Sequence, residues 1–254
     1  MDVGVALELQ RRALEAWIRA LGSGSAGARS LEMAGVTAAV VPAVPAHSIV
    51  NCVTYRDAGA LGDALPALAA AYEEAGVRKW TVWTPEHERE AIAILEEAGH
   101  VFDGAPEAMH LDLAELDAEP ADALDWDAAA DPAEVGRVND VAYGLDAGKG
   151  PGIAVGASSA EARMRLYRAR VDGDVGCVLQ TIDVGDDCFV AFVATLPEQR
   201  GRGLASKLLA EALRNARDRG LRTSSLQSSR LGRGVYERLG YRVACRLHLY
   251  ERRR

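Results

Sequence analysis

Two stretches of this chain follow the same order of elements, and this internal repeat limits the possible folds more than any other feature. Hydrophobic periodicity predicts helix, strand, helix and strand in residues 61–113, and the same order at similar spacing in residues 204–251. The second helix of each stretch runs into a related turn, Glu96-Glu-Ala-Gly99-His100 in the first and Glu237-Arg-Leu-Gly240-Tyr241 in the second. Such short matches also occur among unrelated α/β units. Because order and spacing agree together, we interpret the chain as a duplication.

Both halves are expected to mix helices with short strands. In the first half the patterns predict helices at Val5–Leu21, Leu61–Gly76 and Glu86–Ala98, and strands at Leu31–Val44, Ser48–Tyr55, Trp80–Thr84 and Met109–Leu113. In the second half they predict helices at Ala133–Tyr143, Leu204–Arg219 and Arg230–Leu239, and strands at Arg165–Val171, Val175–Asp183, Cys188–Thr195, Thr223–Ser228 and Arg242–Glu251. Residues 144–159 are glycine-rich and indicate a binding loop. Trp80 and Trp83 are expected to lie on the same face of their strand as core residues. One of them is expected to be buried where the two halves contact each other.

An acidic segment separates the two halves. Residues 103–134 contain eleven Asp or Glu and no Lys or Arg, and Ala, Asp, Pro and Glu dominate the second part. Few apolar side chains are available there to anchor the chain to a core. We therefore expect a domain at residues 1–113, a linker at 114–132 and a second domain at 133–254.

Charge and composition exclude several classes of protein. The net charge is −8, yet residues 198–254 carry 15 Lys or Arg against 5 Asp or Glu. This balance disfavours bulk nucleic-acid binding and suggests an anionic ligand at the basic end. The sequence contains no run of 18 apolar residues that would predict a membrane span, and the N-terminus does not resemble a signal peptide. Four dispersed cysteines are typical of free thiols in a cytoplasmic protein, and five dispersed histidines give no metal site.

The basic end contains a loop suited to a phosphate group. A strand ending near Thr195 leads into Gln199-Arg-Gly-Arg-Gly203, and a helix begins at Leu204. The glycines permit close approach of a ligand, and the first helical turn presents unpaired N–H groups to an anion. A dinucleotide-binding turn is disfavoured because Ser206 replaces the third glycine, and a nucleotide P-loop lacks its Gly-Lys pair. A helix that merely begins with a basic turn is the structural alternative.

The loop also resembles a known signature. Gln199-Arg-Gly-Arg-Gly203-Leu-Ala205 is similar to the acetyl-coenzyme A motif of the GNAT superfamily of N-acetyltransferases, Gln/Arg-x-x-Gly-x-Gly/Ala. Val235-Tyr236-Glu-Arg-Leu-Gly240-Tyr241 resembles a later segment of that family, one helix and one strand downstream. The resemblance covers residues 162–251 and fades toward residue 133. It implies two tandem GNAT-like domains with mostly antiparallel central sheets, of which the first is a degenerate copy without the motif.

The resemblance also implies a role for each matching residue. Val193, Ala194 and Thr195 would pair with the pantetheine arm of acetyl-coenzyme A, the co-substrate. Arg200, Gly201, Arg202 and Gly203, with Ala205 and Ser206 in the first helical turn, would hold the pyrophosphate. Gln199 and Leu204 of the same motif are also expected to bind the coenzyme. Tyr236 would protonate the departing thiolate as general acid, because a Tyr of ordinary pKa near 10 keeps its proton at pH 7. Ser229 stands where many relatives have an Asn that contacts the coenzyme, and its side chain is shorter.

The implied function is transfer of an acetyl group to an amine by direct attack. The acceptor, a small molecule or a peptide amine, is not specified by the sequence. The general base is open among Asp140, Asp146, Asp183, Asp186, Asp187 and a water chain, and for that reason a non-catalytic module that senses acetyl-coenzyme A is the alternative. The oligomeric state is open between a monomeric pseudo-dimer, in which the first half replaces a partner, and a homodimer. Whether the first half binds a ligand is also open.

Overall fold

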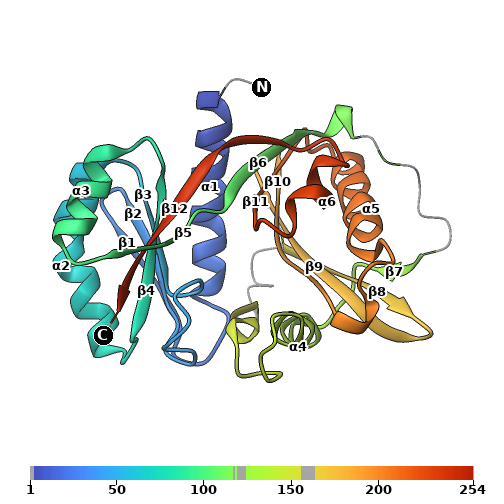
Figure 1. Ribbon diagram of the computed structural model, residues 1–254, viewed down its shortest axis with the longest axis horizontal. Helices are drawn as coiled ribbons and strands as arrows, with labels where there is room; N and C mark the ends of the chain where they lie inside the picture. Colours follow the sequence, from blue (N-terminus) through green and yellow to red (C-terminus); the bar gives the residue numbers. More distant parts are fainter. Residues whose placement is uncertain (1–2, 117, 119–123, 156–163, 254) are drawn as a thin grey trace.

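The elements of the first half follow the expected order in the computed structural model, which describes residues 3–116, 118, 124–155 and 164–253 (Figure 1). The helices are α1 (Val3–Leu21), α2 (Ala58–Glu74) and α3 (Arg89–Glu97). The strands are β1 (Arg29–Met33), β2 (Val36–Val40), β3 (Cys52–Tyr55), β4 (Lys79–Pro85), β5 (Val101–Gly104) and β6 (Glu107–Asp112). A short 3-10 turn, η1 (Leu113–Glu115), ends this half.

The second half repeats the pattern with longer strands. Its helices are α4 (Pro132–Ala142), α5 (Leu204–Asp218) and α6 (Arg233–Glu237), with 3-10 turns η2 (Pro151–Val155) and η4 (Pro197–Gln199). Its strands are β7 (Asp125–Asp127), β8 (Met164–Val171), β9 (Asp174–Val184), β10 (Asp187–Thr195), β11 (Thr223–Ser228) and β12 (Arg242–Arg253). The hairpin between β8 and β9 turns at Asp172 and Gly173, whose φ angles of 55° and 88° are typical of the expected tight turn.

All of these strands form one twelve-stranded sheet flanked by helices. The order is β1-β2-β3-β4-β12-β6-β11-β10-β9-β8-β7, with β5 paired to β12. Among the described strands, β3–β4 and β10–β11 run parallel and the other pairs run antiparallel. Each parallel pair is joined by a crossover helix, α2 in the first half and α5 in the second. The mixed, mostly antiparallel fold that the resemblance implied is therefore confirmed.

The two halves exchange their last strands. Strand β12 runs from the second half into the first, where Leu247–Arg253 pairs with β4 (Figure 1). Strand β6 crosses the other way and pairs along its whole length with β11. Hydrophobic alternation shows that a segment is a strand but not which sheet it joins, so the sequence pattern did not indicate this exchange.

Helix α1 lies between the halves (Figure 1) and fills the seam between them. The indole of Trp17 contacts the rings of Trp83, Phe189 and Phe192, with centroids 6.2, 6.3 and 6.0 Å away. The buried Gln10 side chain donates hydrogen bonds from Nε2 to the carbonyl oxygens of Met109 (2.8 Å) and Leu226 (3.1 Å). The first half is thereby attached to the strand that borders the candidate site.

Four sequence expectations need correction. Residues 31–44 do not form one strand, because Gly35, with φ of 77°, turns the chain between β1 and β2. The helix expected at Arg230–Leu239 is confined to α6, and β5 was not expected. Trp80 and Trp83 lie on opposite faces of β4, since side chains three residues apart in a strand alternate. Trp83 lies at the seam, whereas Trp80 stacks on Tyr72 in the core of the first half.

The acidic segment between the halves contains one strand. β7 pairs with β8, and Trp126 in its centre stacks near Tyr167, with centroids 6.2 Å apart. Residues 117 and 119–123 of the predicted linker lie outside the described residues, as do residues 156–159 of the predicted glycine-rich loop. In the part of the chain that the structure describes, no helix combines the length and apolar character needed to span a bilayer.

Candidate active site

The site begins where two neighbouring strands separate. Strand β10 pairs with β11 only from Asp187 to Val190, although β10 continues to Thr195. Its register with β9 shifts between Ala191 and Ala194, and Phe192 within this bulge has φ of 50°. Positive φ is uncommon for a bulky residue, and a bulge of this kind bends a strand. The edge of β10 that faces β11 is therefore left without a strand partner beyond Val190 in the described structure.

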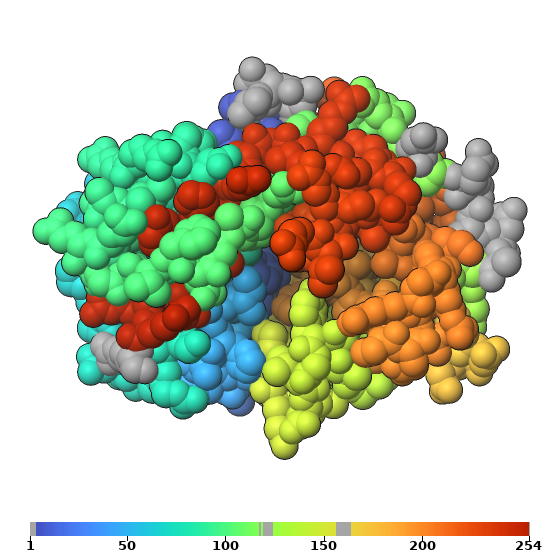
Figure 2. Space-filling view, viewed as in Figure 1, coloured from blue at the N-terminus to red at the C-terminus, as the bar shows by residue number. Residues whose placement is uncertain are grey.

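A cavity of about 800 Å³ opens beside this edge. Figure 2 shows a hollow between the yellow, orange and red segments of the chain. Twelve of the thirteen residues predicted for the site line the cavity: Val193, Ala194, Thr195, Gln199, Arg200, Gly201, Gly203, Leu204, Ala205, Ser206, Ser229 and Tyr236. The thirteenth, Arg202, is exposed and does not line it. The fold thus brings together residues that are up to 43 positions apart in the sequence.

The glycine loop at the cavity has the backbone geometry that its sequence requires. Gly201 and Gly203 have φ of 77° and 73°, in the left-handed region where a side chain is strained. A Cβ at Gly201 would meet no atom within 4 Å, so the space in front of the loop is open. Gly203 is the N-cap of α5 and offers no side-chain cap, while Leu204, Leu208 and Ala212 fix the helix in the core. The positive end of the helix dipole therefore faces the cavity uncapped.

Two arginines make the cavity lining basic. Arg238 lies on the wall beside α6, and Arg200 reaches across the end of β10. The Arg200 guanidinium donates hydrogen bonds to the carbonyl oxygens of Thr195 (Nε to O, 3.3 Å) and Ala142. Arg200 thereby connects the loop to the end of α4 and keeps its charge near the cavity mouth. The described residues of the lining include no Asp, Glu or His, so the site favours an anionic ligand.

The Tyr236 side chain provides a proton donor inside the cavity. Only 8% of the residue is exposed, and no described residue hydrogen-bonds its hydroxyl. Burial, with smaller contributions from Tyr143 and Cys177, raises the pKa of Tyr236 above its usual value of 10. The ring packs edge-on against Tyr241 with centroids 5.9 Å apart, which fixes its position. At neutral pH this hydroxyl is protonated and free to donate to a bound molecule.

Two of the carboxylates considered as general base belong to the loop after α4. Asp140 is fully buried, and its carboxylate accepts hydrogen bonds from the N–H groups of Gly148, Gly150 and Gly152, at 2.8 to 3.1 Å. Asp146 forms an exposed ion pair with Lys149. Neither carboxylate lines the cavity. Asp140 instead holds the chain that leads from α4 into η2.

The other three carboxylates lie near the opposite end of β10. Asp183 is paired with Arg165 and Arg219, and the backbone carbonyl of Asp186 accepts from the N–H groups of Arg222 and Thr223. Burial raises the pKa of Asp187 to about 6, and its carboxylate accepts hydrogen bonds from two hydroxyls. Thr195 lies eight positions further along β10 than Asp187, which corresponds to at most about 26 Å of strand. None of these groups lines the cavity.

Several cavity residues were not found by the sequence motifs. These are Ala142, Tyr143, Leu231, Gly232, Val235 and Arg238. Tyr143 and Leu231 are 65% and 93% exposed, unusual for large apolar side chains, and they border the mouth. Arg238 was within reach of sequence reasoning, since it follows Tyr236 by two positions in the matched segment. Ser229 accepts the N–H of Gly232 (3.3 Å to Oγ) and so shapes the turn before α6.

The first half has no equivalent of the glycine loop. Strand β3 is followed after Arg56 by Asp57, and the Asp57 carboxylate caps α2 by accepting the N–H of Ala60 (2.8 Å). An internal anion therefore occupies the helix N-terminus that is open in the second half.

We expect equilibrium dialysis of the intact chain to give one coenzyme A per chain. Two sites per chain would contradict the interpretation of the first half as a degenerate copy.

Comparisons with known proteins agree with this geometry. Residues 162–243 match the family model for an acetyltransferase (GNAT) domain. A GCN5-related N-acetyltransferase from Kribbella flavida shares 18% identity, with 94% of this chain and 93% of that chain covered and a TM-score of 0.65. One from Sphaerobacter thermophilus shares 18% identity, with 88% and 82% covered and a TM-score of 0.60.

A tandem GNAT protein from the clavulanic acid biosynthesis pathway shares 15% identity, with 86% of this chain and 78% of that chain covered and a TM-score of 0.55. No curated protein matches the sequence. The chain therefore has the mixed α/β fold of the N-acetyltransferase structures to which it is similar. The second half thus matches the GNAT domain model over residues 162–243, and the similarity of the chain to the solved structures is one of fold.

Proposed function

We propose that this chain is an acetyl-coenzyme A-dependent N-acetyltransferase whose second half binds the coenzyme and an amine acceptor. One arrangement carries the proposal: the unpaired edge of β10, the uncapped N-terminus of α5 and the Tyr236 hydroxyl all border one cavity. Acetyl-coenzyme A, when bound, supplies a thioester carbonyl that an amine can attack.

The cavity fits such a co-substrate in three respects. Its volume of about 800 Å³ is within the range of pockets that enclose extended small molecules. The N–H groups at the start of α5 and the nearby Arg200 match a pyrophosphate in charge. The backbone of Val193, Ala194 and Thr195 offers hydrogen bonds to an amide-containing arm, as one strand offers them to another.

The residues then have separate tasks. The β10 edge orients the bound arm, and its N–H groups are available to a carbonyl oxygen at the bulge. Arg200, Gly201, Gly203 and the first turn of α5 hold the phosphate end, while Arg202 has the weakest support because it points outside the lining. Tyr236 donates a proton from its hydroxyl to the leaving sulfur. The described residues that line the cavity include no Asp, Glu or His that could act as general base. We therefore infer that the amine loses its proton to water before it reacts.

The direct test is the release of free thiol from acetyl-coenzyme A in the presence of amines. A panel of small amines and lysine-containing peptides is expected to include at least one acceptor that accelerates release and appears acetylated by mass spectrometry. Coenzyme binding measured by calorimetry, together with no release for any acceptor, would favour the alternative. In that case the chain is an acetyl-coenzyme A-sensing module, which the lack of a carboxylate in the described lining also favours.

The pH profile is expected to report the acceptor amine and not an enzyme carboxylate. Below the pKa of the amine, kcat/KM should rise about tenfold per pH unit, because only the neutral amine attacks. The raised pKa of Tyr236 means that its protonated form persists to higher pH than usual, so activity should not fall up to about pH 10. The pH at which kcat/KM stops rising should therefore differ between two acceptor amines of different pKa. A break near pH 6 or 7 common to both acceptors would reveal a general base of the enzyme.

A further inference from the structure

A second, smaller cavity of about 230 Å³ lies in the first half, at the position that corresponds to the site in the second. The parallel strands β3 and β4 pair only through Cys52–Thr81 and Val53–Val82, and the cavity lies where they separate. Helix α1, the residues before α2 and α3, and Leu247 of β12 complete its walls. Its size excludes coenzyme A and suits a molecule smaller than a typical drug.

The walls combine apolar surface with buried polar atoms. Leu7, Leu14 and Leu247 provide the apolar part. Tyr55 and Trp83 also line the cavity and are only 5% and 4% exposed. The Tyr55 hydroxyl lies near Glu88 and Thr84, and the Trp83 Nε1 lies near the Cys52 sulfur, but none of these contacts has full hydrogen-bond geometry. Buried polar groups are normally satisfied, and the oxygen of the Tyr55 hydroxyl can still accept a hydrogen bond from a ligand or an ordered water.

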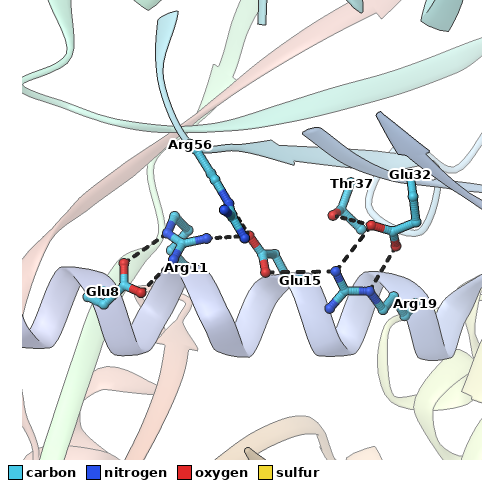
Figure 3. Close-up of polar contacts among 7 residues, drawn as sticks. All are labelled: Glu8, Arg11, Glu15, Arg19, Glu32, Thr37 and Arg56. Atoms are coloured by element: carbon cyan, nitrogen blue, oxygen red, sulfur yellow. Dashed lines mark hydrogen bonds and ion pairs between the residues drawn. The ribbon is translucent and has the colours of Figure 1, made fainter. Parts of the chain in front are cut away.

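The two arginines that line the cavity both take part in ion pairs. Arg11 is paired with Glu8 and Glu15, Arg56 reaches Glu15 at 3.7 Å, and Arg19 links Glu15 to Glu32 (Figure 3). This ladder contains three arginines and three glutamates, so it has no net charge. Figure 3 also shows Thr37, whose hydroxyl donates to Glu32.

Glu88 remains as the unbalanced charge. It lines the cavity, is partly buried, and forms no ion pair with a described Lys or Arg. Its carboxylate lies close to the Tyr55 hydroxyl, and burial together with this negative charge raises the pKa of Tyr55. The Glu88 carboxylate is therefore the charged group of the lining that no described cation pairs with, and it stands beside the apolar wall of the cavity.

We propose that this cavity binds a small organic ammonium compound with an apolar body. The Glu88 carboxylate and the Tyr55 hydroxyl oxygen receive the ammonium group, and the Trp83 indole, which also lines the cavity, is an aromatic ring of the kind that attracts cations. The three leucines cover the apolar body. A small anion is disfavoured because the arginines are occupied and Glu88 would repel it. This ligand site does not depend on the transferase activity of the second half.

The probe is 2-phenylethylamine, with 2-phenylethanol and phenylacetate as neutral and anionic analogues of similar shape. Calorimetry at pH 7 without acetyl-coenzyme A should show binding of the amine and at least tenfold weaker binding of both analogues. Glu88→Gln should lower the affinity for the amine at least tenfold, and Tyr55→Phe should lower it less. Helix α3 should persist in Glu88→Gln, because the Glu88 side chain makes no capping hydrogen bond.

Glu90→Gln is the matched control, since it removes the same charge two residues away at a position outside the cavity. It should bind the amine as the unmodified chain does. Equal affinity for amine and alcohol, no binding of the amine, or unchanged affinity in Glu88→Gln would overturn the proposal. Coenzyme A should bind equally to the Glu88→Gln variant. If the chain binds the amine through Glu88 but binds no coenzyme A, the proposed function is refuted and the proposed amine site is still supported.

Discussion

Tyr236→Phe is expected to lower kcat about 100-fold or more while leaving coenzyme affinity nearly unchanged. The substitution keeps the buried ring and its edge-on contact with Tyr241, and it removes only the hydroxyl that has no described hydrogen-bond partner. A positioned general acid typically contributes 10²–10⁴-fold, and a change confined to the reacting step affects kcat and kcat/KM alike. Steady-state kinetics of thiol release, with coenzyme affinity from calorimetry, measure both quantities.

The matched control is Tyr241→Phe. The Tyr241 hydroxyl is fully buried against the Ser224 hydroxyl, 2.6 Å away, and does not line the cavity. Its loss should reduce the free energy of unfolding by about 1 kcal/mol without a comparable loss of kcat. An unaltered kcat in Tyr236→Phe, with the chemical step shown to limit turnover, would return Tyr236 to a packing role.

Gly203→Asp is expected to weaken coenzyme A binding at least tenfold, equivalent to about 1.4 kcal/mol. The new carboxylate would stand at the N-cap of α5, where the open helix end is proposed to hold a pyrophosphate. The first half already shows this arrangement, because Asp57 caps α2. The left-handed φ of 73° adds strain, although Asp tolerates that region better than most residues.

Gly203→Asn separates charge from shape. Asn has nearly the same size and also tolerates left-handed φ, so it adds the strain and bulk without the negative charge. Calorimetry should place its affinity between that of the unmodified chain and that of Gly203→Asp. Equal affinity for all three folded proteins would exclude the loop as the pyrophosphate site.

The sequence was most informative where chemistry and local geometry coincide. The glycines at 201 and 203 require left-handed backbone, and the structure places both there at the start of α5. Amphipathic helices such as α2 and α5 were located within three residues at each end. Twelve of the thirteen predicted site residues border one cavity because they come from a single strand–loop–helix unit and the segment packed beside it. Their roles in binding and catalysis stay predictions.

Other features depend on distant parts of the chain and left no local signal. Tyr143 reaches the cavity through the packing of α4 on β10, and no periodicity links it to Tyr236. The bulge at Phe192 has no glycine to mark it, and its ring packs against Trp17 from the other half. The prediction of one long strand at residues 31–44 was also wrong, because this hydrophobic run contains a turn at Gly35.

The exchange of β6 and β12 has a consequence for how this molecule folds. The part of the sheet in the first half is completed by residues 247–253, so it cannot close until these residues have been synthesised. Contacts this distant in sequence are slow to form, because the intervening loop must close first. Each half also needs a strand of the other, which couples their unfolding into one cooperative transition and makes cutting the chain between them more damaging than removing a separate domain.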